Sequence, residues 1–466
     1  MTCSFVPPYL LRAIADRAAS RHACVAGQST LHLDSELRSR RYTEPVERLP
    51  TPLRTAMATV VGGTRVVHSA HNTEQLPGDV VRDDDDPASG DAAVDEAHES
   101  SGEVLELFAT QFGRQSADGR GGVLTITVHY GQNYDNAFWD GTQLVFGDGD
   151  GVIFDRFTKP MDVMAHEFTH AVTQFSAGLN YEGQSGALNE SVSDVFASMA
   201  KQRALGQTAD QADWLIGEGI FLPGIQAKAL RSMREPGTAY DDPQIGKDPQ
   251  VGSMADYVDT AEDSGGVHIN SGIPNRAFAL AALGIGGSSW ERAGKVWYDA
   301  LTFGEVGAGA DFVAFAEATV SSANRIFAGE ADVAAQVRSA WVTVGVLADR
   351  PAPVDPASTD AGVSVPVDPT PVSLSPRVAV RRTGGFAGIV QSAELDLDAD
   401  PLGPEVRQLL TGVDLGQIVA GRGIPDGFIY TVEYGDWHLT LPERDLTPEL
   451  HRVVQLVLDP GTDRGL

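Results

Sequence analysis

His166 and His170 stand four residues apart, and Glu167 follows the first of them directly. On an α-helix, residues four apart lie one turn apart on the same face, so both imidazoles can bind one metal ion. Glu167 then lies beside the metal without binding it, where a carboxylate can take a proton from water and pass it on. The spacing therefore predicts a zinc hydrolase site on a helix at 160–174. The plainer interpretation is two histidines on a helix surface.

A second pair of chemical side chains follows twenty residues later. Glu190 and Asp194 are four residues apart in a pattern that predicts a helix at 187–204. A catalytic zinc site has three protein ligands and an open fourth position, so Glu190 can complete a His-His-Glu set. Asp194 can accept the second N–H of a ligand histidine and fix its orientation. The alternative is an exposed helix face that carries two acids.

Charge and cysteine content exclude several classes of protein. A net charge of −30 over 466 residues argues against a nucleic-acid footprint, which needs a basic patch. No apolar run reaches membrane-spanning length, and the N-terminus has no basic region followed by an apolar stretch. Cys3 and Cys24 are the only cysteines, so no disulfide framework supports the fold. We expect a protein that is cytoplasmic or exported without a conventional signal peptide, with no nucleic-acid or membrane partner.

The texture of the sequence changes along the chain and predicts five segments. They are a mildly basic segment at 1–50, a part rich in strands and turns at 51–160, a helical part at 161–348, a Pro-rich linker at 349–376 and a small α+β domain at 377–466. Further helices are expected at 94–111, 271–283, 288–301, 309–328 and 331–344. The last segment is expected to contain strands at 377–382 and 393–398, a hairpin within 428–441, and helices that start near Gly403 and Pro448.

Several blocks of sequence resemble the thermolysin-like metallopeptidases, in their protealysin-like branch. Besides 166–173, the blocks are 136–141, 145–151, 185–190, 230–233 and 265–272, in the family's order. The resemblance covers about residues 60–348. It implies an α+β fold of two lobes, with a β-rich N-terminal lobe, an α-helical C-terminal lobe and a central zinc-binding helix. His166, His170 and Glu190 would be the zinc ligands.

The resemblance also implies roles for the residues around the metal. Glu167 would be the general base and then the general acid toward the scissile peptide. His268 would donate a hydrogen bond to the oxyanion, with Tyr181 as a second donor, and Asp263 would orient His268. Asp194 would support a ligand histidine. Taken alone, His268 would be interpreted as a histidine of a turn or a core.

The blocks imply a cleft for an extended peptide. Asn136 and the backbone of Ala137 resemble the groups that hold the substrate, and Arg231 resembles the arginine that binds its carbonyl. The expected preference is for a large apolar residue after the scissile bond. Read singly, Asn136 could be a turn residue and Arg231 a partner in a surface salt bridge.

Calcium is the weaker metal expectation, and zinc the firm one. Asp162, Asp213 and Glu218 match acids that bind calcium in thermolysin-like enzymes, but Lys201 and Leu215 stand where further acids would be expected. Calcium needs six to eight oxygen ligands, and an ammonium group can replace its charge.

Residues 1–50 resemble the short propeptide of protealysin-like enzymes. The stiff pair Pro7-Pro8 is suited to lie in a substrate cleft, and an Arg-rich helix could dock on an acidic catalytic domain. A thiolate binds zinc well, so Cys3 could cap the metal in the precursor. The alternative is a buried or incidental cysteine.

The domain at 377–466 resembles emfourin-type inhibitors of protealysin-like peptidases. Such a domain, fused through a linker, would act at high effective concentration. The alternative is a module that binds substrate or a surface. The sequence as a whole predicts a latent zinc endopeptidase whose partners are peptide substrates, its own propeptide and its C-terminal domain. The competing hypothesis is a catalytically silent protein-binding member of the fold.

Overall fold

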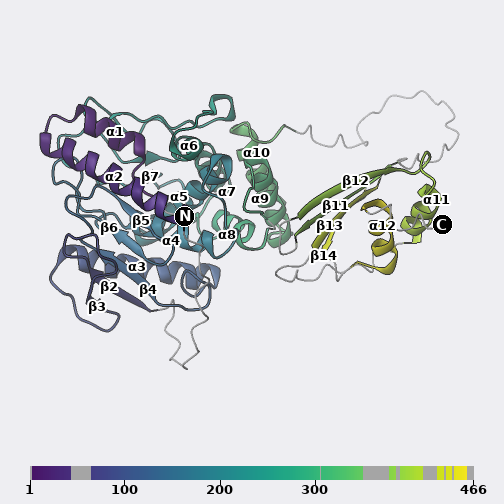
Figure 1. The fold of residues 1–466 in the computed structure, drawn as a ribbon, viewed down its shortest axis with the longest axis horizontal. Coiled ribbons are helices and arrows are strands. Elements are labelled where there is room, and N and C mark those ends of the chain that lie inside the picture. The colour runs from purple at the N-terminus through teal and green to yellow at the C-terminus, as the bar shows by residue number, and fades with distance from the viewer. Residues whose placement is uncertain are drawn as a thin grey trace. The chain divides into compact units, whose positions relative to one another are not determined.

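The chain is described by a computed structural model that covers residues 3–43, 64–304, 306–349, 377–384, 389–412, 428–434, 437–442 and 446–458. It forms two compact units, Met1–Val354 and Asp355–Leu466 (Figure 1). The expected linker at 349–376 lies outside the described residues, apart from Asp349. Each unit has its own hydrophobic core.

The first unit contains a six-stranded sheet built largely from the part of the chain before residue 160. Its order is β1 (Cys3–Ser4), β5 (Ala137–Trp139), β6 (Leu144–Phe146), β4 (Leu124–Val128), β2 (Arg65–Ser69) and β3 (Asp79–Asp83). β1 pairs antiparallel with β5, with Ser4 opposite Phe138. The N-terminus of the chain thus forms one edge of the sheet.

α3 (Ala92–Phe112) covers the sheet and has a clear start and stop. Asp91 accepts hydrogen bonds from the backbone amides of Ala93 and Val94, and Gly113 ends the helix with a left-handed φ of 66°. Phe108 stacks on Phe196 and contacts Phe168 at a tilt, so α3 joins the sheet to the helical part of the unit.

Two helices form the centre of the first unit. α4 (Met161–Gln174) is buried from Asp162 to Thr173, and α5 (Gly183–Ala204) is buried over most of its length. The other helices of the lobe are α6 (Asp263–Asn270), α7 (Gly272–Ile285), α8 (Ala293–Phe303), α9 (Phe312–Ile326) and α10 (Ala331–Thr343). Short elements between α5 and α6 are β7 (Leu215–Ile216), β8 (Arg231–Ser232), β9 (Asp241–Asp242), β10 (Gly246–Lys247) and a 3₁₀ turn at Met254–Asp256.

The N-terminal segment folds as two helices, α1 (Pro8–Arg17) and α2 (Arg21–Thr43). Pro7 is extended, with φ −66° and ψ 147°, but Pro8 is the first residue of α1. The prediction that the Pro-Pro pair lies extended in the cleft is therefore wrong in detail. Proline at the first helical position loses no hydrogen bond, so the pair begins a helix and the extended stretch lies before it.

The second unit has a sheet of order β12 (Ile389–Asp396), β11 (Arg377–Gly384), β13 (Phe428–Tyr434) and β14 (Trp437–Pro442), all antiparallel. Its helices are α11 (Gly403–Gly412) and α12 (Pro448–Leu458). Val378, Val380 and Val453 lie in its core. The first strand, the hairpin and both helix starts agree with the pattern of the sequence, whereas β12 begins four residues before the strand predicted at 393–398 and ends at Asp396.

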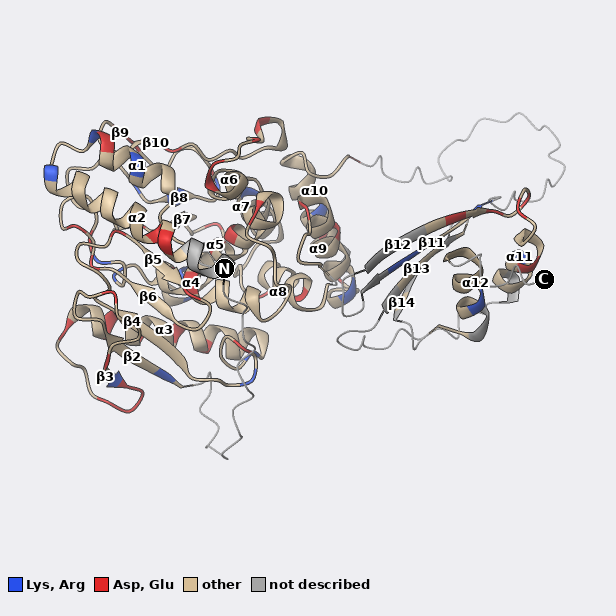
Figure 2. Ribbon diagram, viewed as in Figure 1, with Lys and Arg blue, Asp and Glu red and all other residues tan. Residues whose placement is uncertain are grey.

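Acidic residues are distributed over helices and loops of the first unit, with fewer basic residues between them (Figure 2). Among the described residues, no helix has the length and apolar character needed to cross a membrane.

Candidate active site

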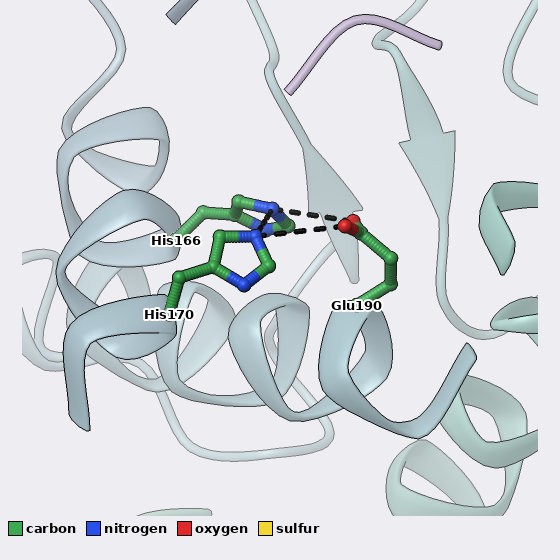
Figure 3. A group of neighbouring side chains, drawn as sticks. All are labelled: His166, His170 and Glu190. Atoms are coloured by element: carbon green, nitrogen blue, oxygen red, sulfur yellow. Dashed lines mark hydrogen bonds and ion pairs between the residues drawn. The ribbon is translucent and has the colours of Figure 1, made fainter. Parts of the chain in front are cut away.

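Three side chains from two helices converge at the centre of the first unit. His166 and His170 project from α4, and Glu190 projects from α5 toward them (Figure 3). The Nε2 atoms of the two histidines are 3.0 Å apart. The Glu190 carboxylate lies 3.4 Å from His166 Nε2 and 3.6 Å from His170 Nε2. The structure thus brings together the three predicted metal ligands.

The outer ring nitrogens of both histidines have hydrogen-bond partners. His166 Nδ1 lies 2.8 Å from Asp194 Oδ1, and His170 Nδ1 lies 2.8 Å from Asn189 Oδ1 and 3.1 Å from Ser193 Oγ. Asp194 and Asn189 accept hydrogen bonds from Nδ1–H, which leaves each Nε2 lone pair directed at the common point. Two imidazole nitrogens and a carboxylate in this arrangement suit zinc.

Three buried carboxylate oxygens at the centre have no hydrogen-bond partner among the described residues, although Glu190 lies within ion-pair distance of His166, His170 and His268. They are Oε2 of Glu190 and both oxygens of Glu167. A buried ionised oxygen without a partner is costly, and a bound cation and its water would satisfy such groups. The residues present therefore fit a zinc ion. Burial raises the pKa of Glu167 to about 8.

His268 faces the same centre from α6. Its Nε2 lies 3.5 Å from Glu190 Oε2, and the Tyr181 hydroxyl is 3.3 Å from that nitrogen. The Tyr181 hydroxyl also donates to Glu190. Asp263 lies 2.7 Å from His268 Nδ1 and accepts the His268 backbone amide at 3.0 Å, so one carboxylate fixes both ring and backbone. Burial would lower the pKa of His268, but Asp263 and Glu190 outweigh it and raise this pKa.

A left-handed turn makes the contact between Asp263 and His268 possible. Ser264, Gly265 and Gly266 have φ values of 52°, 87° and 73°, which glycine adopts without strain. A Cβ on Gly186 of α5 would lie 2.5 Å from the Val267 side chain. Glycine at this position therefore lets α5, which carries Glu190, approach the residue that precedes His268.

Arg231 is fully buried and holds Asp194 with two parallel hydrogen bonds of 2.8 Å, from Nε and Nη2. Asn275 donates a further bond of 2.8 Å to the same carboxylate. Burial alone would raise the pKa of Asp194, but Arg231 and His166 lower it to about 2. Arg231 is therefore no surface salt-bridge partner, because it links the metal ligands to the cleft.

The beginning of the chain lies in this cleft. The Phe5 amide donates to the Ala137 carbonyl at 3.0 Å, and Arg231 Nη1 donates to the Phe5 carbonyl at 3.0 Å. Asn136 accepts from the Val6 amide at 2.7 Å and donates to the Val6 carbonyl at 3.2 Å. The predicted substrate-binding groups thus all hold an extended stretch of the protein's own chain.

Comparison with known proteins identifies the family. Models of the thermolysin metallopeptidase match the chain in two parts, the catalytic domain over residues 51–174 and the α-helical domain over 177–346. An extracellular metalloprotease of Pectobacterium carotovorum subsp. carotovorum is 50% identical over 345 residues, which are 74% of this chain and 96% of the relative. The chain belongs to the thermolysin family of metallopeptidases.

Two further relatives of the thermolysin family agree with this assignment. Protease PrtS of a Photorhabdus strain is 46% identical over 284 residues, which cover 60% of this chain and 76% of that protein. The solved structure of the precursor of protealysin, a metalloproteinase from Serratia proteamaculans, matches with a TM-score of 0.67 and 48% identity, over 74% of this chain and all of that one. The expected two-lobed thermolysin-like fold is confirmed.

The second unit is an emfourin domain, because the emfourin family model matches residues 380–458. The resemblance of the C-terminal domain noted in the sequence is therefore confirmed.

The residues expected for calcium surround an ammonium group in this member of the thermolysin family. Lys201 Nζ lies 2.9 Å from both Asp213 Oδ2 and Glu218 Oε2, and 3.4 Å from the Leu215 carbonyl. Its positive charge lowers the pKa of Asp162, but burial has the larger effect and raises this pKa to about 6. Calcium binding stays a prediction. In this structure the Lys201 ammonium group occupies the position among these acids where a cation would bind.

The proposed thiolate cap also stays a prediction. Cys3 pairs with Trp139 in the sheet, but its side chain lies outside the described ones. The free thiol of Cys24 donates to the Ala18 carbonyl at 3.3 Å, within the N-terminal segment.

Sequence reasoning missed the residues that support the ligands and the cleft. Asn189, Ser193 and Asn275 belong to this group. Asp34 of α2 also does, since it accepts hydrogen bonds from Tyr134 at 2.5 Å and Asn136 at 3.0 Å. The only available signal was a polar residue inside an apolar helical pattern, which says that a side chain is buried and satisfied but not by what.

Proposed function

We propose that this chain is the precursor of a zinc-dependent neutral endopeptidase. The observation that carries the proposal is the convergence of His166, His170 and Glu190 beside the unpartnered carboxylate of Glu167, at a cleft that already holds an extended peptide. His166, His170 and Glu190 would hold zinc. Bound there, zinc would supply Lewis acidity that activates water and polarises a carbonyl.

The remaining steps belong to the protein's own side chains. Glu167 takes a proton from the attacking water and passes it to the nitrogen of the leaving amine. His268, oriented by Asp263, donates to the oxygen that becomes negative in the tetrahedral intermediate, and Tyr181 is the second donor. Preorganised donors of this kind typically contribute about 10²–10³-fold to the rate.

Substrate is held as a strand along β5. Asn136 and the Ala137 carbonyl hold its backbone, and Arg231 binds the carbonyl that follows the scissile bond. The side chain that now lies beside Arg231 is Phe5, which is fully buried, with the guanidinium carbon 4.6 Å from the ring centre. This contact supports a preference for a large apolar residue after the scissile bond.

The two flanking parts would restrain the enzyme. The N-terminal segment occupies the hydrogen-bonding groups that a substrate would need. This occupation supports a latent precursor like that of protealysin. The emfourin domain would restrain the mature enzyme through its tether. The active enzyme would form when the N-terminal segment leaves the cleft.

Peptide cleavage by the mature chain and by Glu167→Gln tests the proposal. The substitution removes the base but keeps the size of the side chain, so we expect cleavage to fall by at least about 100-fold, while zinc content stays the same. Equal activity in both proteins would refute the mechanism and favour a silent binding protein. Glu291→Gln, at an exposed position far along the chain, is the matched control.

A further inference from the structure

The backbone from Ser4 to Val6 forms hydrogen bonds with groups that would hold a bound substrate. The Ser4 carbonyl lies 3.0 Å from His268 Nε2, and the Phe5 carbonyl accepts from Arg231 at 3.0 Å. The Phe5 amide donates a hydrogen bond to the Ala137 carbonyl, and the backbone amide and carbonyl of Val6 both form hydrogen bonds with the Asn136 side chain. His268, Arg231, Ala137 and Asn136 are residues that the proposed function assigns to substrate, and one short stretch of the chain uses all four.

The register of these bonds decides which peptide bond faces the catalytic groups. The carbonyl at His268, the oxyanion donor, belongs to Ser4, and the carbonyl at Arg231 belongs to the next residue, Phe5. Ser4, which precedes the Ser4–Phe5 peptide bond, therefore lies at His268, and Phe5, which follows this bond, lies at Arg231. This is the direction that the proposed mechanism requires of a substrate.

The side chain of Phe5 agrees with this register. Phe5 is fully buried, and its ring lies edge-on to the ligand His166 with 5.1 Å between centres. A Cβ added to Gly217 would lie 3.2 Å from the tip of the Phe5 ring, so glycine there leaves room for a large apolar side chain. Figure 3 shows a short purple piece of the N-terminal segment on the same side of α4 and α5 as the three labelled side chains.

We propose that Ser4–Phe5 is the scissile bond of a substrate-like complex that the enzyme forms with its own N-terminus, and that the zinc-loaded precursor hydrolyses this bond. The inference rests on the proposed function. The oxygen of one water forms a bond to the Ser4 carbonyl carbon, and the bond from that carbon to the Phe5 nitrogen breaks. Glu167 carries the proton from the water to the nitrogen. The products are residues 1–4, with a new carboxylate, and a chain whose amino terminus is Phe5.

The cut does not free the cleft, because the rest of the segment has its own anchors. Val6, Leu10, Leu11 and Ile14 have no exposed surface. Thr30 accepts the Asp135 amide at 3.0 Å, beside the contact of Asp34 with Asn136. A trimmed precursor that is still latent is the expected product, and it precedes release of the whole segment.

Intact-mass spectrometry of the precursor tests the proposal. The protein is prepared free of zinc, zinc is added, and the N-terminus is followed over time. We expect Phe5 to become the new first residue in the wild type and residues 1–4 to remain in Glu167→Gln. Phe5→Gly should slow the cut by at least about tenfold because its pocket is left unfilled. Val25→Ala, at an exposed position, should leave the rate unchanged.

Hydrogen exchange of the zinc-free precursor gives a measure that needs no activity. The Phe5 and Val6 amides should be protected, and Phe5→Gly should remove this protection while Val25→Ala keeps it. Unprotected amides would overturn the inference. So would an intact Ser4–Phe5 bond, or a first cut elsewhere, in a precursor whose mature form, freed of the N-terminal segment, cleaves an added peptide, and the proposed function would then stand. Failure of the mature form to cleave any peptide would overturn both.

Discussion

Asp194 connects three parts of the site at the scale of single residues. Its two oxygens accept hydrogen bonds from His166, Arg231 and Asn275, so one carboxylate orients a proposed metal ligand and the group proposed to bind the peptide carbonyl. A buried charge shared in this way is satisfied only when all partners are present. A change at Asp194 therefore affects metal binding and peptide binding together.

Asp194→Asn should weaken zinc binding by about 10–100-fold, because the amide no longer holds His166 with a charge. Competition with a chelator at pH 7 measures this affinity. Glu291→Gln serves as the control for general effects of charge, and circular dichroism reports whether the variant folds. Wild-type affinity in a folded Asp194→Asn protein would show that His166 needs no such support.

Lys201 gives the second prediction at this scale. Its side chain is 12% exposed, and it balances Asp213, Glu218 and Asp162. Lys201→Met should destabilise the first unit by about 1–3 kcal/mol, since the acids lose their counter-charge. Calcium at millimolar concentration should restore part of the lost thermal stability in the variant and leave the wild type unchanged. Equal responses of both proteins to calcium would contradict the assignment.

At the scale of elements, α1 is attached to the first unit mainly by apolar contacts. Leu10, Leu11 and Ile14 lie on its buried face. The ion pair between Arg12 and Glu262 is exposed, since the Arg12 side chain is 50% and the Glu262 side chain 72% accessible. The sequence led us to expect that an Arg-rich helix could dock on the acidic catalytic part. Because the apolar side chains are buried and the ion pair is exposed, Leu10, Leu11 and Ile14 should contribute most of the free energy of docking.

Leu11→Ala in a Glu167→Gln background should cost about 2–5 kcal/mol of docking, because it removes buried methyl groups and leaves a cavity. Hydrogen exchange in α1 should then be faster by about thirty-fold or more. Arg12→Ala, one residue further on, is the matched control and should change exchange by less than about fivefold. The reverse order of the two effects would mean that charge holds the helix.

The start of α3 depends on a histidine. His129 lies 2.8 Å from Asp148 and 3.2 Å from Asp91, the N-cap of the helix. Its pKa is raised, first by the hydrogen bond to Asp148, against the effect of burial. A raised pKa in the folded state means that the contribution to stability is complete below the unfolded pKa of about 6.5 and is lost as the pH rises through the folded pKa.

His129→Asn keeps a side chain that tolerates the left-handed φ of 54° at this position. The thermal midpoint of the wild type should exceed that of the variant most clearly below about pH 6.5, and the difference should shrink at alkaline pH. Thermal unfolding of zinc-free protein across this range measures the effect. A difference that is independent of pH would exclude an ionised His129 as its source.

Local pattern could predict some of these features and not others. The ligands on α4 and α5 follow from spacing, since four residues make one helical turn. α6 was missed as a helix because Gly265 and Gly266 indicate a loop, and only the tertiary contact with α5 explains their left-handed turn. The contact of Val6 with Asn136 joins residues 130 positions apart, which no local periodicity encodes.

The whole molecule joins a thermolysin-like unit to an emfourin domain. Covalent attachment can give a domain an effective concentration of roughly millimolar, so even weak binding in cis can dominate. The chain therefore carries its proposed regulator in fixed proportion to the enzyme.

Deletion of residues 373–466 from the mature enzyme should speed cleavage of a short peptide, and the separate domain should restore inhibition only at far higher concentration than the tether requires. Initial rates on a short peptide and on a large unfolded protein measure this. An unchanged rate on the peptide with a lower rate on the protein would mean that the domain targets substrate.

β1 lies at the border of the six-stranded sheet and pairs there with β5. When the segment leaves, β5 becomes the border, and its free amide and carbonyl groups form a template that only another extended chain can complete. A folded protein offers such a chain only where it opens locally. Resistance to the mature enzyme should thus follow the local unfolding free energy of each target, as much as the identity of its residues.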